Sequence, residues 1–212
     1  MGKFTKALLW TVGILAGIAL ILRVLVLKAW TVPDDPRLAA SVAPTLAGGD
    51  VVLVLTRGDR GFGDLVRCKD PEDPQRFVVG RIAGVGGDVV EIDGNRLVVN
   101  GKRFEANSAC SDTTFTITHP SSGSEIELRC DVVEMGGGWH YRGFNPKPFQ
   151  AVKSRTEVDP GMVYLLSDNR EHHDDSRDFG LMPAASCSER IVFRLWSDKG
   201  WTDRKRRMTY IH

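Results

Sequence analysis

Ser41 is the residue whose type and setting best fit covalent chemistry. It comes shortly before a proline that stiffens the turn, in the stretch Arg37-Leu38-Ala39-Ala40-Ser41-Val42-Ala43-Pro44-Thr45-Leu46. A serine hydroxyl is a poor nucleophile unless a base within hydrogen-bond reach takes its proton. The rest of the chain must therefore supply that base.

A small set of side chains could act as the base. Lysine serves only when apolar burial lowers its pKa, and Lys69 falls in a polar loop where we expect it to be exposed. Histidine needs no large shift, because its unperturbed pKa is near 6.5. His140 lies in residues 135–144, which we predict to be a flexible loop. His172 and His173 stand together in the run Glu171-His172-His173-Asp174-Asp175.

The same acidic run also invites a metal interpretation. Adjacent histidines without a second cluster of ligands are weak evidence for zinc, and the cysteines form no Cys-x-x-Cys pair. The glycine turn at residues 84–87 is not a phosphate loop, since no Gly-Lys-Ser/Thr follows it. We therefore predict neither a metal site nor a cofactor site.

Composition favours one membrane anchor plus one β-rich domain. The chain has 212 residues, 22 Gly, 10 Pro and a net charge of +1. A nearly neutral chain is not built to bind a polyanion, so we predict no nucleic-acid partner. Cys110 and Cys130 flank one segment and would pair in an oxidising compartment. Alternatively they, with Cys68 and Cys187, pack as independent thiols.

The N-terminus carries an apolar run long enough to cross a bilayer. Residues 7–22 are almost entirely apolar, and about 20 residues span the hydrocarbon core. Trp30 follows as an interfacial aromatic. A cleavable signal peptide is the competing interpretation, but no clear small-x-small cleavage site follows the run. We predict an uncleaved anchor.

The chain divides into an anchor at residues 1–30, a β domain at residues 31–197 and a basic tail at residues 198–212. Within the domain, residues 103–160 form a less regular, inserted region. The tail contains Arg204-Lys205-Arg206-Arg207, which either touches anionic lipid headgroups or stays solvated. Strands are predicted at residues 50–55, 63–66, 77–82, 89–92, 96–99, 113–118, 124–129, 162–166 and 190–196.

Five short motifs follow one another along the chain: Ser41-Val42-Ala43-Pro44-Thr45-Leu46, Gly63-Asp64-Leu65-Val66, residues 80–88, the hairpin of residues 91–101, and residues 167–180. Their order resembles that of the motifs in type I signal peptidases, which are membrane-bound serine endopeptidases of mostly β fold. Each motif is weak alone, but the resemblance extends over most of the chain, and the first motif resembles the family's nucleophile motif. The resemblance implies a signal-peptidase-like β-fold catalytic domain behind one N-terminal transmembrane helix.

The departures from the family pattern concern catalysis. The family's base is a lysine buried beside the serine, and Gly80 holds its position here. Ala39 replaces a serine that often helps to bind the oxyanion, which leaves the Ser41 backbone N–H for that task. The serine that contacts the family's lysine is replaced by His173, with Asp175 two residues on. We predict that Ser41, His173 and Asp175 form a substitute triad, because a carboxylate orients a histidine base.

The resemblance implies an endopeptidase that removes signal peptides from exported preproteins and needs no metal or organic cofactor. It would be a single-pass protein of the cell (inner) membrane, with its catalytic domain on the outer or periplasmic side. The alternative is a catalytically inactive homologue that acts as a membrane-anchored binding protein. A self-cleaving repressor of the same fold is a third possibility, which the membrane anchor opposes.

Overall fold

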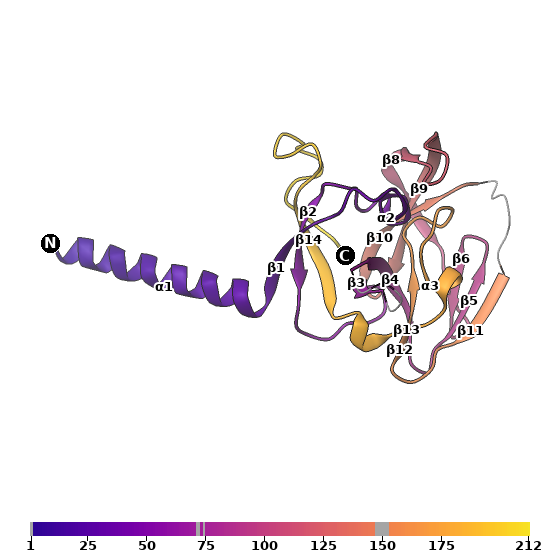
Figure 1. The fold of residues 1–212 in the computed structure, drawn as a ribbon, viewed down its shortest axis with the longest axis horizontal. Coiled ribbons are helices and arrows are strands. Elements are labelled where there is room, and N and C mark those ends of the chain that lie inside the picture. Colours follow the sequence, from indigo (N-terminus) through magenta and orange to yellow (C-terminus); the bar gives the residue numbers. More distant parts are fainter. Residues whose placement is uncertain (1, 71–72, 74, 147–152) are drawn as a thin grey trace.

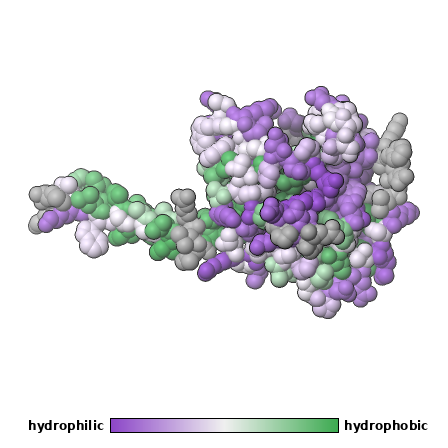
Figure 2. Space-filling view, viewed as in Figure 1, coloured by the Kyte–Doolittle hydropathy of each residue, from purple (hydrophilic) through white to green (hydrophobic). Residues whose placement is uncertain are grey.

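A long apolar helix precedes a body of antiparallel strands (Figure 1). The computed structural model describes residues 2–70, 73, 75–146 and 153–212. Helix α1, Lys3–Leu25, projects away from the body, and its segment Phe4–Ile21 has a mean hydropathy of 1.9 with no part buried. In Figure 2 it is a largely green rod beside a body of mostly purple and white surface. By length and composition, α1 is able to cross a membrane.

The main sheet carries parts of two of the five sequence motifs, residues 63–66 and residues 80–88. Its strands lie in the order β1-β2-β14-β3-β4-β12-β13, and β15 pairs with β14. The predicted strands at residues 50–55, 77–82, 162–166 and 190–196 are confirmed in this sheet. The bounds are β1 Leu27–Thr31, β2 Val51–Leu55, β3 Leu65–Lys69, β4 Phe77–Val85, β12 Met162–Leu166, β13 Met182–Pro183, β14 Glu189–Trp196 and β15 Thr209–Tyr210.

Two smaller sheets complete the body. The first has the order β11-β5-β6-β7 and the second β10-β9-β8. Their bounds are β5 Val89–Asp93, β6 Arg96–Val99, β7 Lys102–Phe104, β11 Lys153–Glu157, β8 Ala106–Thr118, β9 Glu125–Met135 and β10 Gly138–Phe144. The less regular region predicted at residues 103–160 is thus largely strand, and its residues 147–152 lie outside the described residues.

The prediction of a flexible loop at residues 135–144 was wrong. Gly136 and Gly137 have positive φ angles of 58° and 79°, the conformation that a two-residue hairpin turn requires. They join β9 to β10, in which Trp139 and Tyr141 face outward and His140 faces the interior. Aromatic residues that alternate with buried ones suit a strand, so the glycines mark a tight turn.

Three short helical segments interrupt the sheets: α2 Pro36–Val42, α3 Ser176–Phe179 and the 3-10 turn η1 Ala184–Ser186. The core packs the apolar faces of the main sheet against α2, with Leu38, Val42, Val52 and Val54 in one buried cluster. Disulfides join Cys68 to Cys187 and Cys110 to Cys130. The choice that the sequence left open between paired and independent cysteines is therefore settled for both pairs.

Candidate active site

Ser41 lies in the last turn of α2, where the sequence predicted only a proline-stiffened turn. Asp35 caps the helix by accepting a hydrogen bond from the Leu38 N–H at 2.7 Å, and Pro36 stands at the first position. Both residues favour a helix start, because proline is pre-organised there and aspartate satisfies a free amide. The pair Asp35-Pro36 is therefore the sequence signal for α2.

The Ser41 hydroxyl is buried and satisfied within its own helix. The residue is 1% exposed, and its Oγ donates to the Leu38 carbonyl oxygen at 3.0 Å. A serine in a helix commonly makes this bond to the preceding turn. The hydroxyl must rotate away from Leu38 before it can attack a substrate.

The last sequence motif, residues 167–180, holds α2 in place. Asn169 is fully buried, and its Nδ2 donates to the Ala40 carbonyl oxygen at 2.9 Å. Its backbone N–H donates to the Ser41 carbonyl oxygen at 3.0 Å. These two bonds fix the C-terminal half of α2 to the loop that follows β12.

A buried ion pair joins the same loop to β4. The Arg81 Nε donates to the Asp168 Oδ1 at 2.6 Å, and both side chains are 2% exposed. The Thr45 hydroxyl donates to the other carboxylate oxygen at 2.5 Å. The first motif, residues 80–88 and residues 167–180 therefore meet at Asp168. This contact brings three of the five motifs together around the end of α2.

Gly80 lies on β4 beside Arg81 and pairs with Val66 of β3. A Cβ atom added at Gly80 would meet the Leu165 Cβ at 3.4 Å and the Leu166 carbonyl oxygen at 3.5 Å. These are ordinary van der Waals separations, so the backbone there accepts a side chain. The glycine leaves this buried position without an amine.

The structure pairs His173 with Asp178. The His173 Nδ1 and the Asp178 Oδ2 are 2.7 Å apart, and the two side chains are 22% and 43% exposed. A carboxylate at Nδ1 orients an imidazole ring and leaves Nε2 to accept a proton. Among the described residues, no hydrogen bond joins His173 to Ser41.

Asp175, the carboxylate that the sequence favoured, has other partners. Its Oδ2 accepts from the Arg177 Nη2 and from the Ser167 N–H, each at 2.7 Å. It also caps α3, and Asp178 completes a reciprocal capping box by accepting from the Asp175 N–H. The Asp175 carboxylate is therefore held by Arg177 while Asp178 bends back towards His173.

His173 and α2 border a common cavity. Ala40, the neighbour of Ser41, lines a cavity of about 410 Å³ together with His119, His172 and His173. The rings of His119 and His172 meet edge to face, with centroids 5.1 Å apart. This cavity lies between α2 and residues 171–174, and Ser41 itself does not line it.

The other candidate bases are less well placed. Both ring nitrogens of His140 face backbone carbonyl oxygens, those of Met135 and His212 at 2.7 and 2.8 Å. Burial and the nearby Arg81 guanidinium lower the pKa of His140 to about 4. Lys69 is exposed at the end of β3. Neither side chain is arranged to take a proton from Ser41.

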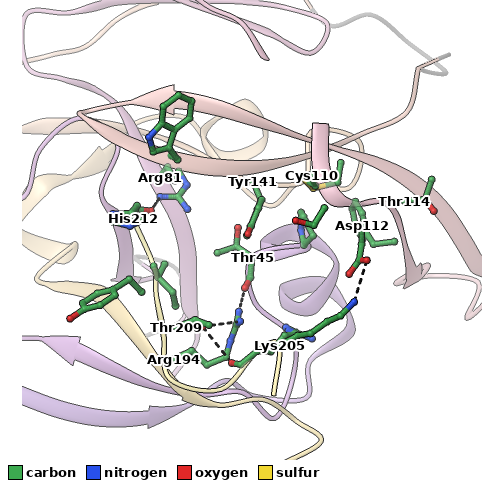
Figure 3. A pocket seen from close by; sticks show the side chains of 18 residues that line it. Thr45, Arg81, Cys110, Asp112, Thr114, Tyr141, Arg194, Lys205, Thr209 and His212 are labelled. Atoms are coloured by element: carbon green, nitrogen blue, oxygen red, sulfur yellow. Dashed lines mark hydrogen bonds and ion pairs between the residues drawn. A yellow bond between two sulfur atoms is a disulfide. The ribbon is translucent and has the colours of Figure 1, made fainter. Parts of the chain in front are cut away.

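A second cavity, of about 570 Å³, opens between Thr45, Arg81 and the chain's last residues (Figure 3). Ser41 does not line it. Tyr141 and the Cys110–Cys130 disulfide line it from the β8-β9-β10 sheet. Lys205 reaches towards Asp112 at its edge, with 3.5 Å between Nζ and Oδ1. This cavity is lined by Pro44 and Thr45 but not by Ser41.

His173, Asp175 and Asp178 also lie close enough to be tested as a metal site. One ligand atom from each lies within 4.8 Å of the others. Both Asp175 oxygens, however, accept hydrogen bonds from Arg177. A cation would have to displace that guanidinium, so the donor set fits an ion pair better than a metal.

The ion pair between Asp175 and Arg177 makes a testable contribution to acid stability. Burial disfavours the Asp175 carboxylate, but the charge and hydrogen bonds of Arg177 outweigh it and lower the pKa of Asp175 to about 2. As the pH falls, Asp175 therefore takes up a proton in the unfolded chain before it does so in the folded chain. The contribution, about 2 kcal/mol of unfolding free energy, should be complete above pH ~4 and lost as the pH falls through about 2.

Urea unfolding of the wild type and of Asp175→Asn, followed from neutral to acid pH, checks this. The variant should be less stable at pH 7 by about 3–5 kcal/mol, because Arg177 loses its buried partner, and should lack the acid-dependent component. Asp112→Asn, at an exposed carboxylate, is the matched control. Equal acid dependence in both variants would contradict the assignment.

Comparison with known proteins agrees with the motifs and the fold. A family model described as "Signal peptidase, peptidase S26" matches residues 5–196. Signal peptidase IB of Staphylococcus aureus (strain N315) is 28% identical over 163 residues, covering 74% of this chain and 73% of the relative. Mitochondrial inner membrane protease subunit 1 of Mus musculus is 25% identical over 167 residues, covering 76% and 69%. Since the family model spans most of the chain, this protein belongs to the signal peptidase S26 family.

Proposed function

We propose that this protein is a serine endopeptidase that removes signal peptides from exported preproteins, with Ser41 as the nucleophile and His173 as the general base. The observation that carries the choice of base is the 2.7 Å contact between the His173 Nδ1 and Asp178. This contact makes Asp178, rather than Asp175, the orienting carboxylate. Membership of the signal peptidase family supports the reaction and the substrate class.

The proposed mechanism begins with rotation of the Ser41 hydroxyl away from Leu38 towards the cavity beside Ala40. The His173 Nε2 takes the hydroxyl proton as Oγ attacks the carbonyl carbon of the scissile bond. The negative charge of Asp178 stabilises the imidazolium that forms. The same proton passes to the leaving amine, and water then hydrolyses the acyl-enzyme.

The anchor and the disulfides support a location at the membrane with the β domain in an oxidising compartment. Helix α1 has the length and hydropathy of a single span. Two disulfides in one domain are typical of proteins outside the reducing cytosol. We therefore place the domain on the outer or periplasmic side of the cell membrane, where exported preproteins emerge.

A catalytically silent homologue is the second candidate, and a specific observation favours it. Ser41 is 1% exposed and its hydroxyl donates to the Leu38 carbonyl oxygen, and Gly80 supplies no amine. In this alternative the protein would bind preproteins at the membrane without cutting them.

Incubation of the purified full chain with a preprotein that has small residues before the cut separates the two candidates. The proposed enzyme should release the mature protein with wild type and release none with Ser41→Ala. The serine variant should keep its structure, because it loses only one hydrogen bond within α2. Binding of the preprotein with no Ser41-dependent product would support the silent homologue.

A further inference from the structure

We propose that residues 209–212, here called the strap, position α2 by holding the Arg81 guanidinium in place. The strap follows β14 in the chain and includes β15. It does not line the cavity between α2 and residues 171–174. Its effect on cleavage rests on the proposed function, whereas its effect on α2 does not.

The strap is fixed to the main sheet. Strand β15 pairs with β14, where Tyr210 stands opposite Phe193, and the two rings meet edge to face with centroids 5.0 Å apart. The Ile211 N–H donates to the Val192 carbonyl oxygen at 3.0 Å. The Ile211 side chain packs against the buried cluster that includes Val42 of α2. The strap therefore has a defined path beside the segment that carries Ser41.

The end of the strap meets Arg81. The His212 carbonyl oxygen accepts a hydrogen bond from the Arg81 Nη1, and Figure 3 shows the two residues close together at one end of the larger cavity. The same carbonyl oxygen faces the His140 Nδ1 at 2.8 Å. Arg81 Nη1 also donates to the Gly63 carbonyl oxygen at 3.0 Å. Because Nη1 carries two N–H groups, these two carbonyls use both of them.

The other edge of the same guanidinium holds the loop that fixes α2. Arg81 Nε and Nη2 donate to the Asp168 carboxylate at 2.6 and 3.1 Å, and Thr45, shortly after the end of α2, donates to it as well. Arg81 is 2% exposed, and a buried donor that loses its acceptor is costly. Loss of the His212 carbonyl should therefore make the guanidinium turn and loosen its contact with Asp168.

The expected effect is local to α2. Asn169, the neighbour of Asp168, donates to the Ala40 and Ser41 carbonyl oxygens, so a shift of this loop reaches α2 directly. The apolar residues of β5 and β6 belong to a different buried cluster from the one that Ile211 packs against. A positioning role therefore predicts a change in α2 without an equal change in β5 and β6.

Hydrogen–deuterium exchange of the full chain in detergent micelles tests the proposal. Ile211→Pro removes the N–H that donates to Val192, because proline has none. Exchange in residues 36–46 should then rise by roughly tenfold or more, because local opening of α2 becomes easier. Exchange in residues 89–99 should stay at the wild-type rate. Ile211→Val keeps the N–H and is the matched control.

A second variant tests the path through Arg81. Arg81→Lys keeps a positive charge for Asp168, but a lysine cannot form the same fork and reach both carbonyls at once. It should raise exchange in residues 36–46 by itself. Adding Ile211→Pro should raise it little further, because both changes break the same link. Fold-changes that multiply in full would show that the strap acts by another route, and would overturn the proposal.

His140→Phe decides the question if Ile211→Pro does not fold. It removes the second contact of the His212 carbonyl and leaves the sequence of the strap unchanged. Exchange should rise in residues 36–46 and not in residues 89–99, by less than with Ile211→Pro, since the bond to Arg81 remains. An equal rise in both regions, or no rise in residues 36–46, would overturn the proposal for either variant.

The preprotein assay gives an independent readout. Ile211→Pro should lower kcat by roughly 10–10²-fold, because small displacements at a catalytic site can cost that much. KM should stay close to the wild-type value, since the strap does not line the cavity beside His173. Raised exchange with wild-type kcat would overturn the effect on cleavage. If the wild type does not cleave, the proposed function fails, while the exchange measurement still decides the role of the strap.

Discussion

Replacing His173 with alanine should lower the rate of preprotein cleavage by roughly 10²–10⁴-fold, the usual contribution of a general base. The His173 side chain makes its hydrogen bond to Asp178, a residue that is itself 43% exposed. Its removal should therefore leave the fold intact. Initial cleavage rates at substrate concentrations above and below KM would show whether the loss lies in kcat.

His172→Ala is the matched control for this prediction. His172 is adjacent, lines the same cavity and packs against His119 rather than pairing with a carboxylate. It should cleave at close to the wild-type rate. Asp178→Asn should give a smaller loss than His173→Ala, since it removes the charge that favours the imidazolium. Wild-type cleavage by His173→Ala would eliminate His173 as the base.

Introducing lysine at Gly80 in the His173→Ala background should recover cleavage by on the order of 10²-fold or more. The resemblance of residues 80–88 to the family's motif implies that the family's lysine base falls at this position. A Cβ atom there meets neighbours only at 3.4 Å and beyond, so the backbone can accept the side chain. Burial disfavours a charged amine and lowers its pKa. The recovered activity should therefore rise with pH as the lysine loses its proton.

Gly80→Met in the same background separates chemistry from packing. Methionine is similar in length to lysine but has no amine, so it should recover nothing. The recovered cleavage should be lost again when Ser41→Ala is added. That result would show that the oxyanion and substrate contacts around Ser41 are intact. If the wild type is inactive while Gly80→Lys cleaves, the natural protein is the silent homologue. A folded Gly80→Lys variant without any cleavage would contradict the expected position of the base.

The strands and the anchor were predictable because their signals are local. Buried strands such as Val51–Leu55 read as short apolar runs, and α1 reads as a continuous apolar helix. The strand β10 was missed because three consecutive glycines were interpreted as flexibility. The helix α2 was missed although Asp35 and Pro36 mark its start.

The sequence by itself determined which family the motifs resemble, that Ser41 stands in the first of them, and that position 80 holds glycine and not lysine. These are properties of residue type and order, which need no coordinates. Only the tertiary structure decided which carboxylate meets His173. The start of α3 forms a capping box that turns Asp178 back towards the histidine, while Arg177 holds Asp175 as a buried ion pair. Both aspartates are close to His173 along the chain, so spacing could not separate them. The competition of a guanidinium for one carboxylate depends on distances that only the folded chain sets.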